Sequence, residues 1–230
     1  MDESVCTIGL IMTVTSLLAA TELFEGLDPE VIESLANQST QHTLRRNDVI
    51  FAEGDTSDAL FVVASGRVAI ANKSVDGRES VVALMEPGDL FGEMPLFDGL
   101  GRSAEARALE QSTVVSIPYA PIRALYEAQP EQLWRVVRML AVRLRAMDEA
   151  LADAVFLDVT GRTAKRLLEL AGDKDEFVLP ITQEELAGMV GASRERVNKA
   201  IAAFIRLGWI QQIDRRYVIT NRRQLEIRAR

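Results

Sequence analysis

Residues that commonly hold metals or form disulfides are scarce in this 230-residue chain, which contains one cysteine, Cys6, and one histidine, His42. A single cysteine excludes an internal disulfide and any multi-cysteine iron–sulfur or zinc site. We expect Cys6 to be a passive thiol, with a redox role as the alternative. A single histidine is too little for a histidine metal cluster. We expect His42 on a strand surface, with metal or haem ligation as the minor alternative.

Long hydrophobic runs are also missing. The apolar run between Ile8 and Ala20 is too short to span a membrane, and it follows Asp2 and Glu3 where a signal peptide would carry basic residues. We therefore expect a cytoplasmic protein in which residues 1–20 form a loose or docking extension. The sequence has no Ser/His/Asp or Cys/His set and no nucleoside-triphosphate phosphate loop, which argues against an enzyme.

Basic charge is scarce overall but concentrated at one end. The formal net charge is -8, yet from Asp158 onward 14 basic residues face 10 acidic ones, a net of +4. The preceding part has 12 basic and 24 acidic residues, a net of -12. An acidic front joined to a basic tail predicts a sensing part and a nucleic-acid-binding part.

The segment from Ile181 to Ile210, ITQEELAGMVGASRERVNKAIAAFIRLGWI, predicts two short helices around a tight turn. Thr182 and Glu185 make a capping box for the first helix. Gly191 supplies the turn and Ser193 caps the second helix. Helical spacing gives the second helix a buried side that consists of Val197, Ile201, Phe204 and Ile205.

The other side of this second helix is polar and contains Arg194, Glu195, Asn198 and Lys199, with Arg196 at the flank. A helix with a dry back and such a front can lie in the major groove, donating to guanine and accepting from cytosine. The alternative is an ordinary amphipathic helix on which Glu195 pairs with Lys199 one turn later. The ordered set of caps, small residue, turn glycine and core residues favours DNA recognition.

Pro130 introduces a predicted helix over residues 131–156. Its apolar residues repeat in steps of four and three, at Leu133, Val137, Leu140, Leu144, Met147, Leu151 and Ala154. A heptad seam of this length is typical of a coiled coil, and we interpret it as a parallel homodimer seam. Packing against the chain's own barrel is the alternative, although it favours a broader stripe. A dimer would read a two-fold symmetric site with half-sites about one DNA turn, roughly 34 Å, apart.

The remaining segments predict a barrel, a hinge and a wing. Residues 28–36 read as a short helix, and residues 41–118 as glycine-punctuated strands of an antiparallel barrel or jelly roll. FLDVTGR, residues 156–162, ends the long helix, and its Asp158 can cap the next one. WIQQI and YVIT predict a hairpin wing around Asp214, with Arg215 and Arg216 available to DNA phosphates.

A candidate ligand site lies in FGEMPLFDGLGRSAEARA, residues 91–108. Gly92 lets a backbone N–H approach a ligand, and Glu93 offers an acceptor suited to a ribose hydroxyl. Arg102 and Ser103 offer a guanidinium and a hydroxyl suited to a phosphate with one negative charge. The alternative is that Glu93 and Arg102 pair with each other across the loop.

From Thr21 onward the chain resembles the cyclic-AMP receptor protein and fumarate–nitrate regulator superfamily of bacterial transcription factors. The resemblance rests on the barrel, the FGE…RSA cassette, the long helix, FLDVTGR and the ITQEE…VGASRE helix-turn-helix. It implies an α+β fold with four parts: an N-terminal extension (1–20), a jelly-roll cyclic-nucleotide-binding domain (21–130), a dimerisation helix (131–157) and a winged helix-turn-helix domain (158–230).

The resemblance also implies roles for individual residues. In the cassette, Gly92 and Glu93 would contact the ribose and Arg102 and Ser103 the cyclic phosphate. The expected ligand-binding residues are Gly92, Glu93, Met94, Arg102, Ser103, Arg143, Met147 and Asp148. The expected DNA-binding residues are Thr182, Gln183, Ser193, Arg194, Glu195, Arg196, Asn198, Lys199, Arg215 and Arg216. A TGTGA-like half-site and its inverted partner follow.

Two departures from the family pattern affect these expectations. Cyclic-AMP-responsive relatives offer hydroxyl groups to the adenine where this chain has Met147 and Asp148, so affinity or selectivity should differ. The loop over 171–180 is shorter than in the best-known activator, which puts the familiar contact with RNA polymerase in doubt. A single cysteine also excludes the iron–sulfur cluster of the fumarate–nitrate branch.

These observations predict a homodimeric transcription regulator with cyclic AMP as its allosteric effector, and with cyclic GMP or no nucleotide as alternatives. The nucleotide would bind between the barrel and the seam helix, and double-stranded DNA is the expected partner, with RNA polymerase as a further one. One alternative binds DNA largely without nucleotide. A second, of another class, is a cyclic-nucleotide module that docks on a protein partner, which the basic tail disfavours.

Overall fold

The computed structural model describes residues 13–73, 79–214 and 216–230, so Cys6 and Arg215 lie outside the described residues. The chain divides into two compact units. The first runs to Ala69 and resumes over Leu84–Met139, and the second combines Ile70–Ala83 with Leu140–Arg230. The four-part division expected from the sequence stays a prediction.

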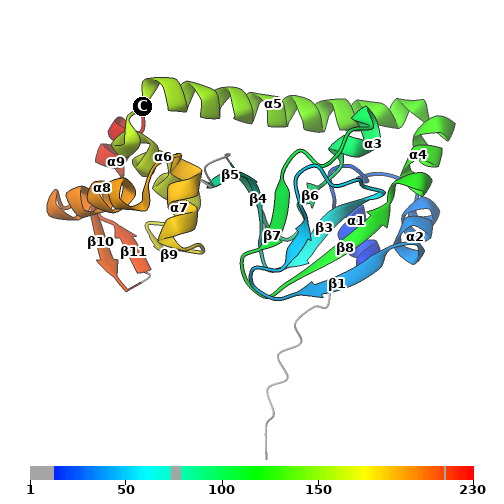
Figure 1. Cartoon of the computed structure of the whole chain (residues 1–230), viewed down its shortest axis with the longest axis horizontal. Helices are drawn as coiled ribbons and strands as arrows, with labels where there is room; N and C mark the ends of the chain where they lie inside the picture. Colours follow the sequence, from blue (N-terminus) through cyan, green and yellow to red (C-terminus); the bar gives the residue numbers. More distant parts are fainter. Residues whose placement is uncertain (1–12, 74–78, 215) are drawn as a thin grey trace, which may run out of the picture. The chain divides into compact units, whose positions relative to one another are not determined.

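Two four-stranded sheets build the barrel expected from the alternating, glycine-punctuated strands (Figure 1). One has the order β1-β8-β3-β6, with bounds Thr40–Leu44, Ser112–Pro118, Ala59–Ser65 and Leu90–Phe91. The other has the order β2-β7-β4-β5, with bounds Val49–Phe51, Glu105–Ala108, Val68–Lys73 and Glu79–Met85. The pairings β1·β8, β3·β8, β3·β6 and β2·β7 are antiparallel, which confirms the predicted sheet type.

The core of the first unit lies between the first sheet and several helices. Leu60 and Val62 of β3 and Val115 and Ile117 of β8 alternate inward, as expected for strands with one buried face. Helices α2 (Pro29–Asn37) and α4 (Tyr119–Ala128) bury their apolar sides in the same cluster. Helix α3 (Met94–Asp98) follows β6 after Gly92 and Glu93 and adds Leu96 to the cluster.

The N-terminal segment contributes to this core. Thr13 caps helix α1 (Val14–Ala19) by accepting the backbone N–H of Ser16 at 3.2 Å. Leu17 and Leu18 of α1 are fully buried in the cluster. Residues 13–20 therefore pack as part of the first unit and do not form the loose or docking extension expected for them. The reason is that Leu17 and Leu18 are buried in its hydrophobic core.

His42 is exposed on β1, with its Nε2 atom 3.0 Å from the Ser116 Oγ atom. This confirms the strand-surface position expected for it. Across the residues that the structure describes, no group of three or more His, Cys, Asp or Glu side chains could hold a metal ion. Within the same residues, no helix has the length and apolar content needed to cross a bilayer.

The long predicted helix is α5 (Leu133–Phe156), entered through a 3-10 turn at Pro130–Gln132. The start expected near residue 131 and the end at 156 are thus confirmed. Val136 and Met139, near its N-terminus, are buried in the core of the first unit. The remaining length, from Leu140, belongs to the second unit.

The second unit is a helix-turn-helix with a small sheet. It contains helices α6 (Val159–Ala171), α7 (Gln183–Val190), α8 (Arg194–Arg206) and α9 (Arg222–Arg228) and a three-stranded sheet of order β10-β11-β9. The strands are Ile210–Ile213, Arg216–Ile219 and Glu176–Val178. The predicted wing is thus β10–β11, and β9 adds a strand in the segment expected as a plain loop. Its core includes Leu167, Leu186, Phe204 and Tyr217.

Candidate functional site

Arg102 is the centre of the cassette. Its side chain is 6% exposed and lies over the Phe51 ring, with the guanidinium carbon 4.1 Å from the ring centroid. Its Nη1 atom donates to the Gly92 carbonyl at 2.7 Å and to the Tyr119 hydroxyl at 3.1 Å, and its Nη2 atom donates to the Ala59 carbonyl at 2.7 Å. These contacts hold the guanidinium plane in one orientation.

Some donor capacity of this guanidinium is unused. The Arg102 Nε atom is buried and has no hydrogen-bond partner among the described residues. Nη2 carries two N–H groups, of which the contact to Ala59 uses one. Burial lowers the pKa of Arg102, which reflects the cost of holding a cation there. A buried cation with a spare Nε/Nη2 edge fits a bidentate oxyanion such as a phosphate.

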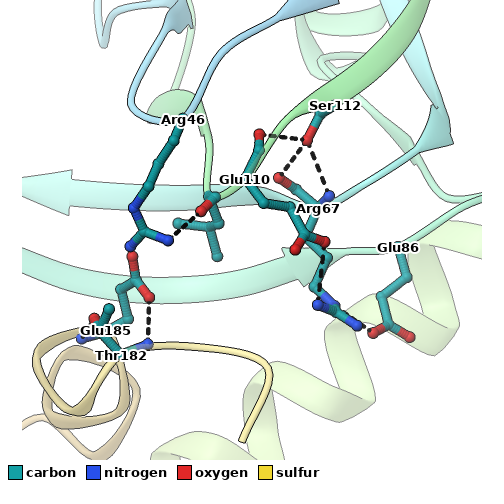
Figure 2. A network of polar contacts seen from close by, with 8 residues as sticks. Arg46, Arg67, Glu86, Glu110, Ser112, Thr182 and Glu185 are labelled. Atoms are coloured by element: carbon teal, nitrogen blue, oxygen red, sulfur yellow. Dashed lines mark hydrogen bonds and ion pairs between the residues drawn. The ribbon is translucent and has the colours of Figure 1, made fainter.

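Arg67 provides the contrast of an arginine whose charge is already paired. Its Nε lies 3.1 Å from a Glu86 carboxylate oxygen and its Nη1 lies 3.2 Å from a Glu110 oxygen. Its backbone is fixed by Ser112, which accepts from its N–H and donates to its carbonyl (Figure 2). The hydrogen bonds of Arg102 described above go to two carbonyls and a hydroxyl, none of which carries a formal charge, and the alternative in which Arg102 pairs with Glu93 stays a prediction.

Gly92 is required by two features of its position. Its φ angle is +75°, and a Cβ built on it would lie 2.5 Å from the Arg102 Nη1 atom. A larger residue would therefore be strained and would also push the guanidinium away. The carbonyl of Gly92 accepts from both Arg102 and Tyr119, at 2.7 and 2.5 Å.

The four main cassette residues lie on either side of helix α3, in the connection from β6 to β7. Glu93 is buried at 3% exposure, whereas Ser103 is exposed and its Oγ atom lies 3.5 Å from the Met94 sulfur. Met94 is exposed at the start of α3. The other expected ligand residues, Arg143, Met147 and Asp148, lie on α5 in the second unit and are half-buried or exposed, so their roles stay predictions.

Sequence reasoning missed Phe51 and Tyr119, which contact Arg102, and Ser57, which contacts the Tyr119 hydroxyl. They come from three different segments, and no short motif joins them to the cassette. The β3·β8 register, which pairs Ala59 with Pro118, carries Tyr119 next to Asp58, whose carbonyl accepts the Tyr119 N–H at 2.7 Å. Only this strand pairing could have revealed the contact.

The helix-turn-helix has the caps that its sequence predicts. Thr182 Oγ1 accepts the Glu185 N–H at 3.2 Å, and Glu185 accepts the Thr182 N–H at 2.6 Å, which is a complete capping box (Figure 2). Gly191 ends α7 at φ +67°, in the left-handed region. Ser193 caps α8 by accepting the Arg196 N–H at 3.4 Å. Thr182 and Gln183 are half-buried at the start of α7.

Helix α8 presents the predicted polar face. Arg194, Glu195, Arg196 and Lys199 are exposed, and Asn198 is half-buried with its Oδ1 atom buried. Glu195 and Lys199 form an ion pair at 2.7 Å, as the simpler alternative expects, and this hydrogen bond lowers the pKa of Glu195. Both side chains are largely solvated, so the pair is weak and leaves them able to exchange partners.

One residue of the predicted buried side is misplaced. Val197, Ile201 and Phe204 are buried, but Ile205 is 40% exposed. Helix α8 ends at Arg206, and the chain turns back so that Trp209 stacks on Phe204 with ring centroids 5.7 Å apart. The returning chain thus packs on Phe204, and Ile205 stays largely exposed.

Of the two wing arginines expected to contact DNA phosphates, Arg216 lies within the described residues. Arg216 begins β11, is exposed, and forms an ion pair with Glu176 of β9 at 2.6 Å. Asp214 adopts a positive φ of 55° at the hairpin tip. The expectation for Arg215 falls outside the described residues.

The hinge is fixed by local polar contacts within the second unit. Asp158 caps α6 by accepting the Gly161 N–H at 2.8 Å, as predicted, and also forms an ion pair with Arg228 of α9. Arg162 donates to the Leu157 carbonyl at 2.7 Å and to the Val190 carbonyl at 2.8 Å. It therefore ties the end of α5 to the end of α7, one residue before the turn glycine.

The negative charge of Asp158 is expected to add to the stability of the second unit. The Gly161 N–H and then Arg228 lower the pKa of Asp158, so its contribution is present above a pH of about 4 and is lost as the pH falls through the lowered value. Asp158→Ala should lower the free energy of unfolding by about 1 kcal/mol at neutral pH. Thermal unfolding between pH 3 and 7 measures this.

Asp158→Asn is the matched control, because asparagine also caps helices but carries no charge. It should retain most of the stability and lose the pH dependence. Equal loss in both variants would contradict the capping role.

The heptad residues of α5 are exposed along the single chain. Six apolar seam side chains are between 38% and 69% exposed, namely Leu133, Val137, Leu140, Leu144, Met147 and Leu151. Ala154 is exposed as well. The buried α5 residues, Val136 and Met139, lie off this seam. The intramolecular alternative, in which the seam packs on the chain's own barrel, thus finds no support in the burial of these residues.

Known proteins share both units. Residues 41–129 match the family model of the cyclic nucleotide-binding domain, and residues 161–228 match that of the Crp-like helix-turn-helix domain. The chain is 38% identical over 221 residues to the CRP-like cAMP-activated global transcriptional regulator of Mycobacterium tuberculosis, covering 93% of this chain and 99% of that one.

Solved structures of transcriptional regulators are also similar to this chain. The c-di-GMP responsive global regulator CLP of Xanthomonas campestris is 26% identical, with a TM-score of 0.73 over 84% of this chain and 99% of that one. The catabolite activator protein of Thermus thermophilus is 32% identical, with a TM-score of 0.52 over 91% and 98%. The chain belongs to the cyclic-AMP receptor protein and fumarate–nitrate regulator superfamily, whose members are DNA-binding transcriptional regulators and not enzymes.

Proposed function

We propose that this regulator is a homodimer that binds an inverted TGTGA-like repeat under the control of cyclic AMP. The observation that supports nucleotide control most strongly is the buried Arg102 with its spare Nε/Nη2 edge. A cyclic phosphate carries one negative charge and two exocyclic oxygens, which match that edge. Glu93, buried one residue after Gly92, supplies the acceptor for a ribose hydroxyl.

The named relatives differ in effector. The Mycobacterium tuberculosis protein is called cAMP-activated, whereas the Xanthomonas campestris protein is called c-di-GMP responsive. We favour cyclic AMP because the fully matched relative carries that name and because a single arginine edge suits one phosphate. Calorimetry with cyclic AMP and cyclic GMP, with and without a palindromic duplex, tests this choice.

The same experiment distinguishes this proposal from a second candidate function. Met147 and Asp148 offer no hydroxyl group where cyclic-AMP-responsive relatives do, and this favours a regulator that binds DNA largely without nucleotide. A large increase in DNA affinity on addition of cyclic AMP excludes that candidate. DNA binding that is equally tight in its absence excludes nucleotide control.

Nucleotide and DNA would be coupled through α5 and the hinge. The effector acts by its differential affinity for two arrangements of the paired helices, and a coupling of about 1–3 kcal/mol is typical of such systems. The contacts of Asp158 and Arg162 give the hinge a defined geometry that such a shift could select.

Arg194 is the residue that we expect to contribute most to base recognition. It is exposed in the first turn of α8, where recognition helices contact base edges. Arg194→Ala should cost about 1–3 kcal/mol on the matched site, roughly a 5- to 150-fold loss, and much less on random DNA. Fluorescence anisotropy with both duplexes at fixed salt measures the difference.

Arg206→Ala is the matched control for this prediction. Arg206 is exposed in the last turn of the same helix, and its replacement removes the same charge. It should weaken both duplexes by similar, small factors. If Arg194→Ala also weakens both equally, Arg194 contacts phosphates and does not read bases.

A further inference from the structure

A buried hydroxyl group lies directly behind the Arg102 guanidinium. The Tyr119 Oη atom accepts from Arg102 Nη1 at 3.1 Å, donates to the Gly92 carbonyl at 2.5 Å, and lies 3.0 Å from the Ser57 Oγ atom. Tyr119 is 6% exposed and is the first residue of α4. Its hydroxyl therefore joins the arginine, the strained glycine and a second hydroxyl in one network.

This network determines which edge of the guanidinium remains available. Both N–H groups of Nη1 are used, one by Gly92 and one by Tyr119, while Nε keeps its N–H unused. A tyrosine hydroxyl is an acceptor with no formal charge, so it orients the cation without neutralising it. Burial raises the pKa of Tyr119, which keeps the hydroxyl protonated and able to donate to Gly92.

A second tyrosine on the same helix shows that burial alone does not require such contacts. Tyr126 of α4 is 7% exposed, and its buried Oη atom has no hydrogen-bond partner among the described residues. Tyr126 packs its ring with Phe97, with centroids 6.1 Å apart. The two tyrosines thus match in burial and helix but differ in what their hydroxyl groups do.

We infer that Tyr119 is a positioning residue for the anion site, which holds the Arg102 guanidinium so that its Nε/Nη2 edge meets the two exocyclic oxygens of the cyclic phosphate. The inference rests on the proposed function. Without the hydroxyl, Arg102 Nη1 and the Gly92 carbonyl each lose a partner, and the guanidinium can rotate away from the productive orientation.

Tyr119→Phe removes only the hydroxyl, and Tyr126→Phe is its matched control. Calorimetry with cyclic AMP should show about a tenfold weaker affinity for Tyr119→Phe, the loss expected for one hydrogen bond to a charged group. Tyr126→Phe should change the affinity less than twofold. Circular dichroism and thermal unfolding establish that both variants are folded.

A second readout tests orientation. The two diastereomers of adenosine 3′,5′-cyclic phosphorothioate carry sulfur on one or the other exocyclic position, so an oriented arginine edge binds them with different affinities. We expect Tyr119→Phe to reduce this affinity ratio and Tyr126→Phe to preserve it.

An unchanged cyclic-AMP affinity in folded Tyr119→Phe would overturn the inference. So would a tenfold loss with an unchanged diastereomer ratio, because the hydroxyl would then contribute only packing, and so would an unmodified protein that does not distinguish the diastereomers. Absence of cyclic-nucleotide binding by the unmodified protein overturns the proposed function itself, and it is recognised before any variant is made.

Discussion

Leu144→Lys combined with Leu151→Lys is expected to convert the proposed dimer into a monomer and to weaken binding to an inverted repeat more than about 100-fold. Both leucines are exposed on the single chain and lie on the heptad seam of α5. Each buried leucine contributes about 1.5–3 kcal/mol, and a dimer loses four of them and gains four charges in the seam. A monomer also loses the benefit of binding the second half-site from the same molecule.

Val142→Lys is the matched control. Val142 is 57% exposed, close to the 59% of Leu144, but it lies two residues from the seam positions 140 and 144 and so on another side of the helix. The dimerisation constant and the DNA affinity of this variant should each lie within about twofold of the values for the unmodified protein. Sedimentation equilibrium and anisotropy on the same samples measure both. A double variant that remains dimeric would show that the seam is not the interface.

Arg102→Ala is expected to weaken cyclic-AMP binding by on the order of 100-fold or more and to abolish the response of DNA binding to the nucleotide. In the proposed site the variant removes two charge-assisted hydrogen bonds to the cyclic phosphate, each expected to contribute about 1.5–3 kcal/mol. Salt-dependent, non-specific DNA binding should remain, because it depends on the basic second unit. Calorimetry and gel shifts with and without cyclic AMP measure the two effects.

Arg67→Ala controls for the loss of an arginine from the same unit. Arg67 is paired with Glu86 and Glu110, so its replacement should affect stability and leave nucleotide affinity nearly unchanged. If Arg102→Ala binds cyclic AMP as tightly as the unmodified protein, the pocket assignment is wrong.

The features that the sequence predicts well are those built from neighbouring residues. The capping box of Thr182 and Glu185, the cap at Ser193 and the left-handed Gly191 each depend on residues within a few positions of one another. Asp158 is of the same kind, since its cap bond reaches only three residues onward. Such signals act locally, so sequence alone is sufficient to identify them.

The wrong predictions concern residues whose burial depends on tertiary packing. The helical repeat places Ile205 on the buried side of α8, but the returning chain brings Trp209 over Phe204 and leaves Ile205 exposed. Leu17 and Leu18 lie in an apolar run that the sequence alone does not assign to the core. Their burial depends on the packing of the first unit's core around them. Sequence periodicity cannot supply either neighbour.

The cassette combines both situations. Gly92, Glu93, Arg102 and Ser103 form a recognisable pattern, and the structure places them on either side of helix α3. The residues that orient Arg102 come from distant segments, and the contact with Tyr119 exists because strands β3 and β8 pair with Ala59 opposite Pro118. The register of long-range strand pairing is not readable from a single sequence, which is why Tyr119 went unpredicted.

The most direct test of the whole account is the mass of the complex on DNA. Sedimentation equilibrium of the unmodified protein with cyclic AMP and one duplex that carries an inverted repeat should give two chains per duplex, and a dimer when DNA is omitted. A complex of one chain that binds the inverted repeat tightly, from a protein that is monomeric in the same buffer, would contradict the pairing of α5 helices on which the proposal depends.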